Sequence, residues 1–107
     1  MMLLELHPEA MEELEAAVAW QNHERAGRGD RLYDEVRRRL AQATRFPRSG
    51  APVAGFDARY NVRSYGLRRF PYRIVTAVVS GAPLVVAIAH TRREPAYWRD
   101  RLGTGDE

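Results

Sequence analysis

The stretch that decides the fold runs from Phe70 to Arg101 and reads FPYRIVTAVVSGAPLVVAIAHTRREPAYWRDR. Its first apolar run, Arg73–Val79, is rich in β-branched residues, which favour strands. Ser80–Pro83 has the Gly and Pro residues typical of a reversing loop, and a second apolar run, Leu84–Ala89, follows it. The pattern predicts an antiparallel hairpin. Its near-continuous apolarity predicts that both faces of the sheet are at least partly covered.

Polar residues stand at the two ends of this hairpin that antiparallel pairing brings together. Arg73 opens the first strand, and His90, Arg92 and Arg93 follow the second. Because the start of one strand then lies beside the end of the next, we expect these side chains to form one basic patch. The hairpin therefore predicts the centre of the fold and also the place of a functional surface.

The length of 107 residues is enough for one domain with a modest core, and we assign residues 1–107 to it. The sequence contains no cysteine, so neither a disulfide framework nor a thiolate metal site is available. The N-terminus does not have the pattern of a signal peptide, and no apolar run approaches the length of a membrane span. We expect a soluble cytoplasmic protein with no membrane partner.

The charges are distributed unevenly along the chain. Residues 1–24 contain six acids and no Lys or Arg, whereas residues 49–93 contain seven arginines against the single acid Asp57. All seventeen basic residues are arginine, which a genome rich in G and C would explain. Base composition does not decide where in the chain a charge lies, however. A basic sheet beside an acidic helix indicates a polyanionic or acidic partner on the sheet side.

The N-terminal half predicts a short strand followed by two helices. The strand is the apolar run Leu3–Leu6, and Pro8 then marks the first turn of a helix that runs to about Glu24. Asp30 is the predicted N-cap of a second helix that ends near Arg45. We place four acids of the first helix on its outer faces: Glu9, Glu12, Glu13 and Glu15.

The second helix carries three consecutive arginines, 37–39. Consecutive residues of a helix point in different directions, and Asp34 and Glu35 lie one turn earlier, where they can pair with these arginines. We therefore predict a solvated helix face here in preference to a nucleic-acid site.

Two further elements complete the predicted fold. Tyr60–Phe70 is predicted as a strand that pairs with the one beginning near Tyr72, and Glu94–Leu102 as a short C-terminal helix. The predicted class is α+β, with an N-terminal strand, an antiparallel helical hairpin, a three-stranded antiparallel sheet and the short C-terminal helix.

The sequence lacks the motifs of metal-dependent and cofactor-dependent catalysis. His7, His23 and His90 have no ligand-like spacing, no nucleophile elbow surrounds a serine, and no Gly-rich phosphate loop is present. We therefore expect no metal and no cofactor. The remaining candidates are basic or aromatic: Arg73, His90, Arg92 and Tyr97 as catalytic residues, and Arg63, Arg68, Arg69, Arg93 and Trp98 as nucleic-acid-binding residues.

Such residues suit one kind of chemistry. Guanidinium groups bind phosphate and stabilise charge that develops on phosphorus, and aromatic side chains stack on unpaired bases. A His or Tyr can move a proton as the 2′-hydroxyl of RNA attacks the adjacent phosphate, a reaction that needs no metal. Structural roles stay open as alternatives: Arg73 as a surface residue, His90 as a core histidine, and Tyr97 and Trp98 as anchors of the last helix.

Two motifs resemble the RelE/ParE family of bacterial toxins: FPYRI at 70–74 and AIAHTRREPAYWRDR at 87–101. The resemblance covers nearly the whole chain, because it extends to His7–Ala10, Glu13-Leu14, Trp20 and Phe46-Pro47. It implies a strand–helix–helix–three-strand fold. It also implies the toxin of a type II toxin–antitoxin pair, neutralised by a cognate antitoxin in a hetero-oligomer.

The resemblance implies two different targets. RelE-like members cleave mRNA on the ribosome with basic residues of the sheet and a C-terminal Tyr or His, and Arg73, Arg92 and Tyr97 fall at or near those positions. ParE-like members poison DNA gyrase, and His90 after an apolar strand is more similar to this branch. The leading hypothesis is metal-independent, ribosome-associated mRNA cleavage. The alternatives are a gyrase poison without nuclease activity and an inactive homologue that binds its antitoxin.

Overall fold

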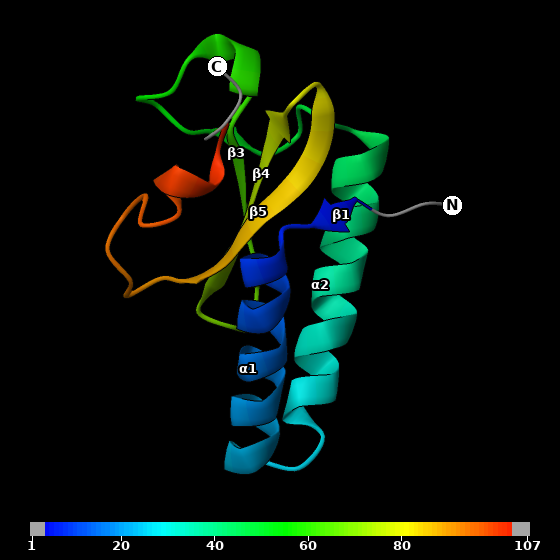
Figure 1. Ribbon diagram of the computed structural model, residues 1–107. Helices are drawn as coiled ribbons and strands as arrows, with labels where there is room; N and C mark the ends of the chain where they lie inside the picture. The colour runs from blue at the N-terminus through cyan, green and yellow to red at the C-terminus, as the bar shows by residue number, and fades with distance from the viewer. Residues whose placement is uncertain (1–3, 104–107) are drawn as a thin grey trace.

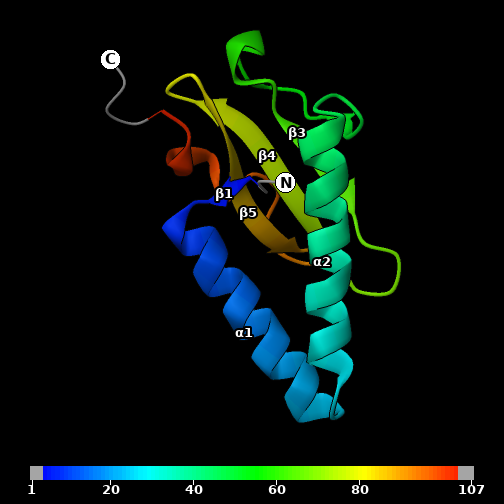
Figure 2. The same ribbon diagram turned by 90° about the vertical axis from the view of Figure 1, so that its right-hand side faces the viewer.

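The computed structural model describes residues 4–103, in which two helices pack on one face of a five-stranded sheet. The helices are α1 (Pro8–Glu24) and α2 (Arg28–Arg45). The strands are β1 (Glu5–Leu6), β2 (Ala51–Pro52), β3 (Arg63–Gly66), β4 (Tyr72–Val79) and β5 (Ala82–His90), in the sheet order β1-β5-β4-β3-β2. Figures 1 and 2 show the C-terminal segment on the side of the sheet away from the helices.

The predicted hairpin is confirmed as the antiparallel pair β4 and β5. Its loop is shorter than predicted, because the chain reverses over Ser80 and Gly81 alone, with φ of 53° and 78°. Positive φ at both central residues is characteristic of the two-residue hairpin turn whose backbone twist matches that of the flanking strands. Pro83 therefore lies inside β5. It is tolerated because β1 pairs with β5 only at Leu84 and Val85, which leaves this end of β5 as an edge.

Apolar side chains cover both faces of the sheet, as predicted from the near-continuous apolar runs. On the helix side, Ile74 and Val85 pack with Leu32 and Val36 of α2 and other residues of that core. The opposite face has a second core that includes Val75, Val86, Trp98 and Leu102. The alternation of neighbours such as 74 and 75 between the two cores follows from the strand period of two.

The sheet differs from the predicted three antiparallel strands, because two short strands extend it at its edges. β2 pairs with β3 in the antiparallel sense, whereas β1 pairs with β5 in parallel, so the sheet is mixed. The predicted strand Leu3–Leu6 is observed as Glu5–Leu6, and Leu3 lies outside the described residues. β3 is shorter than Tyr60–Phe70, since a 3₁₀ turn at Ala58–Tyr60 precedes it and the β3–β4 turn follows it.

The helical hairpin is confirmed, with one corrected boundary. His7 caps α1 through its Nδ1, which accepts the N–H of Glu9 at 3.1 Å. α2 begins at Arg28 after Gly27, whose φ is 87°, so Asp30 lies within the first turn and is not the N-cap. Glycine provides the left-handed conformation that this tight link requires. Within residues 4–103, no helix combines the length and the apolar character needed to cross a membrane.

The predicted C-terminal helix at Glu94–Leu102 is wrong, because only a 3₁₀ turn forms, at Arg99–Arg101. Ala96 has a φ of 59°, which is incompatible with an α-helix, and Pro95 disfavours helical geometry at Glu94. The conformation of this segment is therefore determined by its contacts with the sheet and with α1, and not by the helical spacing of its residues.

Gly29 sets the distance between the helices. A Cβ built on Gly29 would lie 2.1 Å from the carbonyl oxygen of Val18 and 2.7 Å from Asn22 atoms. We expect Gly29→Ala to destabilise the protein by roughly 1–3 kcal/mol through overpacking, although alanine is the better helix former by about 1 kcal/mol. Thermal unfolding measures the change, with exposed Ala16→Gly reporting helix propensity alone. A higher melting temperature for Gly29→Ala would contradict this packing.

Candidate functional site

The start of β4 and the end of β5 meet at a small cavity, as the hairpin register requires. Tyr72 pairs with His90, and Arg73 with Ala89. The cavity has a volume of about 260 Å³, and five of the predicted site residues line it: Arg73, His90, Arg93, Tyr97 and Trp98. Arg92 is exposed and does not line this cavity. The structure therefore brings Arg73, His90 and Tyr97 of the predicted catalytic set together around one cavity, whereas Arg92 is not among the lining residues.

Two of these side chains have fixed partners. The Nε of Arg73 donates to the Ser64 hydroxyl oxygen of β3 at 2.6 Å, while the residue as a whole stays exposed. The Nδ1 of His90 accepts the backbone N–H of Arg92 at 3.0 Å, and its ring meets Tyr72 edge-on with centroids 5.1 Å apart. His90 is therefore half-buried at the strand end, and its Nε2 is the ring nitrogen left to carry a proton.

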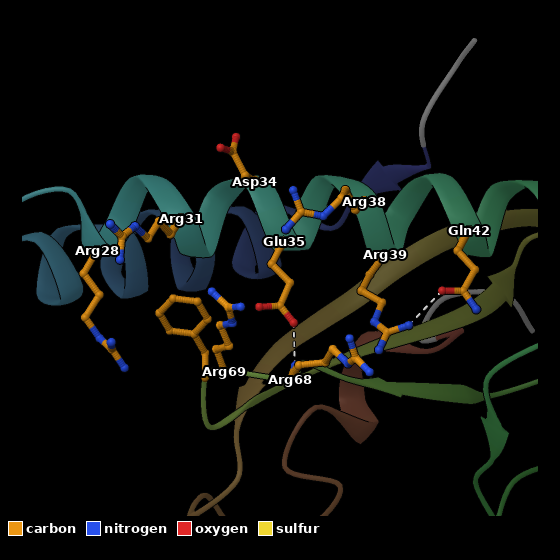
Figure 3. A pocket seen from close by; sticks show the side chains of 10 residues that line it. Arg28, Arg31, Asp34, Glu35, Arg38, Arg39, Gln42, Arg68 and Arg69 are labelled. Atoms are coloured by element: carbon orange, nitrogen blue, oxygen red, sulfur yellow. Dashed lines mark hydrogen bonds between the residues drawn. The ribbon is translucent and has the colours of Figure 1, made fainter.

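The three other predicted nucleic-acid-binding arginines are distributed elsewhere. Arg63 donates from Nη1 to the carbonyls of Gly50 at 3.1 Å and Arg48 at 3.3 Å, which ties β3 to the segment after α2. Arg68 and Arg69 lie in the β3–β4 turn facing α2 (Figure 3). These arginines do not line the cavity beside Arg73.

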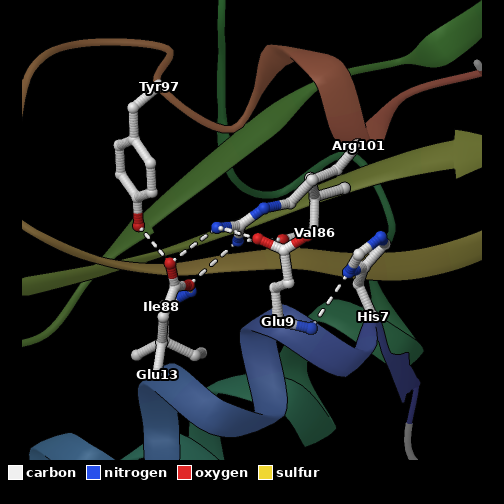
Figure 4. Close-up of polar contacts among 7 residues, drawn as sticks. All are labelled: His7, Glu9, Glu13, Val86, Ile88, Tyr97 and Arg101. Carbon is white, nitrogen blue, oxygen red and sulfur yellow. Dashed lines mark hydrogen bonds and ion pairs between the residues drawn. The ribbon is translucent and has the colours of Figure 1, made fainter.

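A cluster around Glu13 joins α1, β5 and the C-terminal segment (Figure 4). The carboxylate accepts the backbone N–H of Ile88 at 3.0 Å and the Tyr97 hydroxyl at 2.8 Å. Arg101 donates from Nη1 at 3.1 Å and from Nη2 at 2.9 Å, and its Nη1 also donates to the Val86 carbonyl at 3.0 Å. Two charged side chains, both mostly buried, are thereby paired and hydrogen-bonded, the condition under which burial is tolerated.

The Glu13 cluster controls the proton of Tyr97. Burial, the hydrogen bond to Glu13 and the negative charge of Glu13 together raise the pKa of Tyr97 to about 12, against the opposing effects of Arg93 and Arg101. The Arg93 guanidinium lies over the ring at 3.7 Å from its centroid. Tyr97 is therefore a neutral hydrogen-bond donor at physiological pH, and its hydroxyl is directed at α1.

Trp98 is a packing residue on the second core. It is only 5% exposed, and its ring stacks on Phe56 with centroids 5.2 Å apart and planes inclined by 21°. An indole in this position anchors the C-terminal segment to the sheet. It presents no free face for a nucleotide base.

Glu13 is the important residue that sequence reasoning missed, since it was placed on the outer face of the first helix. The structure places it half-buried beside Ala10, Leu14 and Ala17, which α1 buries. The signal was present in the sequence, because position 13 is three residues after 10 and four before 17, at the spacing of one helical face.

A family model described as the ParE toxin of the type II toxin–antitoxin system, parDE, matches residues 4–95. The chain belongs to the ParE toxin family. A search of curated proteins gives no match.

As a ParE-family toxin, the protein has a cognate antitoxin as its partner. The matched range contains the helical hairpin, the sheet and Glu13, and it ends two residues before Tyr97. Within the described residues of the toxin, no group of three His, Cys, Asp or Glu side chains is arranged to hold a metal ion.

We expect Glu13→Gln to destabilise the toxin, because the mostly buried Arg101 loses the nearer of its two carboxylate partners and keeps only the exposed Glu9, at 3.3 Å. The expected loss is about 1.5–3 kcal/mol, the range for hydrogen bonds to charged groups. Chemical denaturation measures it, and Glu12→Gln, the same change at an exposed site one residue away, should shift stability by less than about 0.5 kcal/mol. Equal stabilities for the two variants would show that the cluster does not hold the C-terminal segment.

Proposed function

We propose that this toxin arrests growth by binding DNA gyrase and not by cutting mRNA. The observation that carries the proposal is the position of the Tyr97 hydroxyl. It donates a hydrogen bond to Glu13 at 2.8 Å, and its pKa is raised to about 12. Efficient general acid–base catalysis needs a group whose pKa lies near the working pH. Tyr97 meets neither this requirement nor the need to face a substrate.

The composition of the cavity wall supports the same proposal. Apolar residues make up much of the cavity wall, including Val53, Val75 and Pro95. An apolar cavity with cations at its rim suits an apolar side chain of a protein partner beside an acidic one.

One observation favours mRNA cleavage as the second candidate. Arg73, His90 and Arg93 line a single cavity, and the Nε2 of His90 is available for proton transfer. In either case, we propose that the toxin acts in the cytoplasm and that its antitoxin covers this cavity in a hetero-oligomer.

Two parallel assays distinguish the proposed targets. Purified toxin is added to a reaction in which gyrase supercoils relaxed plasmid DNA, and to ribosomes that translate a defined mRNA. We expect inhibition of supercoiling, reversed by the antitoxin, and intact mRNA. Arg73→Ala should weaken inhibition, whereas Arg25→Ala, at an exposed arginine of the helical hairpin, should not. Cleaved mRNA together with unaffected gyrase would overturn the proposal in favour of the nuclease.

Tyr97→Phe distinguishes the two roles of the hydroxyl in cells. If Tyr97 serves only as a donor to Glu13, the variant should arrest growth as the parent does at a temperature where it remains folded, with a somewhat lower melting temperature. Growth after induction without antitoxin measures this. Loss of arrest by a variant that melts like the parent would identify Tyr97 as a proton carrier.

A further inference from the structure

A second and larger cavity lies between α2 and the β3–β4 turn, on the helix side of the sheet (Figure 3). It is an open groove of about 670 Å³. Six arginines line it: Arg28, Arg31, Arg38, Arg39, Arg68 and Arg69. The other lining residues are Asp34, Glu35, Gln42 and Phe70. No residue is shared with the cavity that contains Arg73.

Two of the groove arginines are held in place by uncharged neighbours. Arg28 donates from Nε to Gln21 at 2.7 Å and lies over the Phe70 ring, 4.9 Å from its centroid. Arg39 donates from Nη1 to Gln42 at 2.8 Å. Each keeps further N–H donors for a ligand, because a guanidinium group has five.

The acids of the groove do not neutralise it. Glu35 is 8% exposed, and its carboxylate accepts the backbone N–H of Arg68 instead of pairing with Arg38 or Arg39, so the predicted helical pairing is wrong. Figure 3 shows Asp34 pointing away from the β3–β4 turn. Across residues 4–103, the ion pairs involve Arg101 and none of the groove arginines. The six arginines outnumber the two acids of the lining by four charges, and closely spaced cations in such excess create a strong positive potential.

We propose that this groove binds the phosphate backbone of a nucleic acid. From Arg28 to Arg39, α2 presents its guanidinium groups over about 16 Å at 1.5 Å per residue. That length corresponds to roughly five phosphates of one duplex strand at 3.4 Å each. Guanidinium groups match phosphate oxygens in geometry and charge, and they do so without reading the base sequence.

The lining favours phosphates over an acidic peptide. An amphipathic peptide that binds a groove uses apolar anchors as well as charge, but the aromatic ring available here, Phe70, is buried and covered by Arg28. The exposed apolar side chains of the helical hairpin, such as Met11 and Trp20, do not line the groove. A polyanion with no apolar part therefore fits better.

Binding at this groove is measured without gyrase or ribosomes, so its outcome is independent of the function proposed above. Fluorescence anisotropy with the purified toxin uses three labelled probes of equal length: duplex DNA of mixed sequence, single-stranded RNA and a polyglutamate peptide. The variant Arg31→Gln/Arg38→Gln/Arg69→Gln removes three exposed groove charges. Its matched control, Arg25→Gln/Arg37→Gln/Arg45→Gln, removes three charges that do not line the groove.

We expect the groove variant to bind nucleic acid about tenfold more weakly or worse than the control at moderate salt. The slope of affinity against salt should fall by about one unit for each phosphate that the variant no longer neutralises. The comparison of DNA with RNA identifies which backbone the groove prefers. Single variants Arg31→Gln and Arg69→Gln, on separate elements, give the same answer if the triple variant does not fold. Equal binding by the groove and control variants would overturn the proposal, as would tighter binding of polyglutamate than of either nucleic acid.

Discussion

The carboxylate of Glu13 is the contact on which the rest of the arrangement depends. It receives four hydrogen bonds, from the backbone of β5, from Tyr97 and from both terminal nitrogens of Arg101. Burying a carboxylate costs free energy unless its oxygens are hydrogen-bonded. Burying a guanidinium group such as that of Arg101 is costly in the same way when it loses a carboxylate partner. One side chain of α1 thereby fixes a C-terminal segment that has no regular helix of its own. It also determines the chemistry of the cavity beside it, because Tyr97 is committed as a donor.

The hairpin and the helical hairpin could be predicted from the sequence because their signals are local. The runs 73–79 and 84–89 specify strands, and the spacing of apolar residues from Pro8 to Glu24 specifies a helix. The short edge strands could not be predicted, since two residues such as Glu5 and Leu6 become a strand only by pairing with β5. The prediction of a C-terminal helix was wrong for a related reason. Tyr97 and Trp98 lie at helical spacing from Arg101, but the left-handed Ala96 and the distant acid Glu13 determine the path of the segment.

The candidate site was predictable in position more than in composition. Antiparallel pairing brought Arg73 to His90 as expected, whereas the direction of each side chain depended on contacts made by other elements. Arg63, Arg68 and Arg69 belong to one stretch of sequence, yet Arg63 serves the loop after α2 while the other two face that helix. The pairing of Glu35 with the backbone of Arg68 links residues 33 positions apart, which no helical spacing reveals. The ParE toxin thus presents an apolar-walled cavity on one face of its sheet and an arginine-lined groove on the other.

The most direct measurement for this account is the titration of the Tyr97 hydroxyl, followed by NMR with ring-labelled tyrosine and assigned with the Phe variant. Because the folded pKa lies above the unfolded value of about 10, the hydroxyl contributes its full stability below that pH and loses it as pH rises through the folded value. We predict a pKa of about 12 in the native toxin, and a lower value when Glu13 is replaced by Gln. A native pKa at or below 10 would contradict it, because Tyr97 would then be free of Glu13 and available for proton transfer.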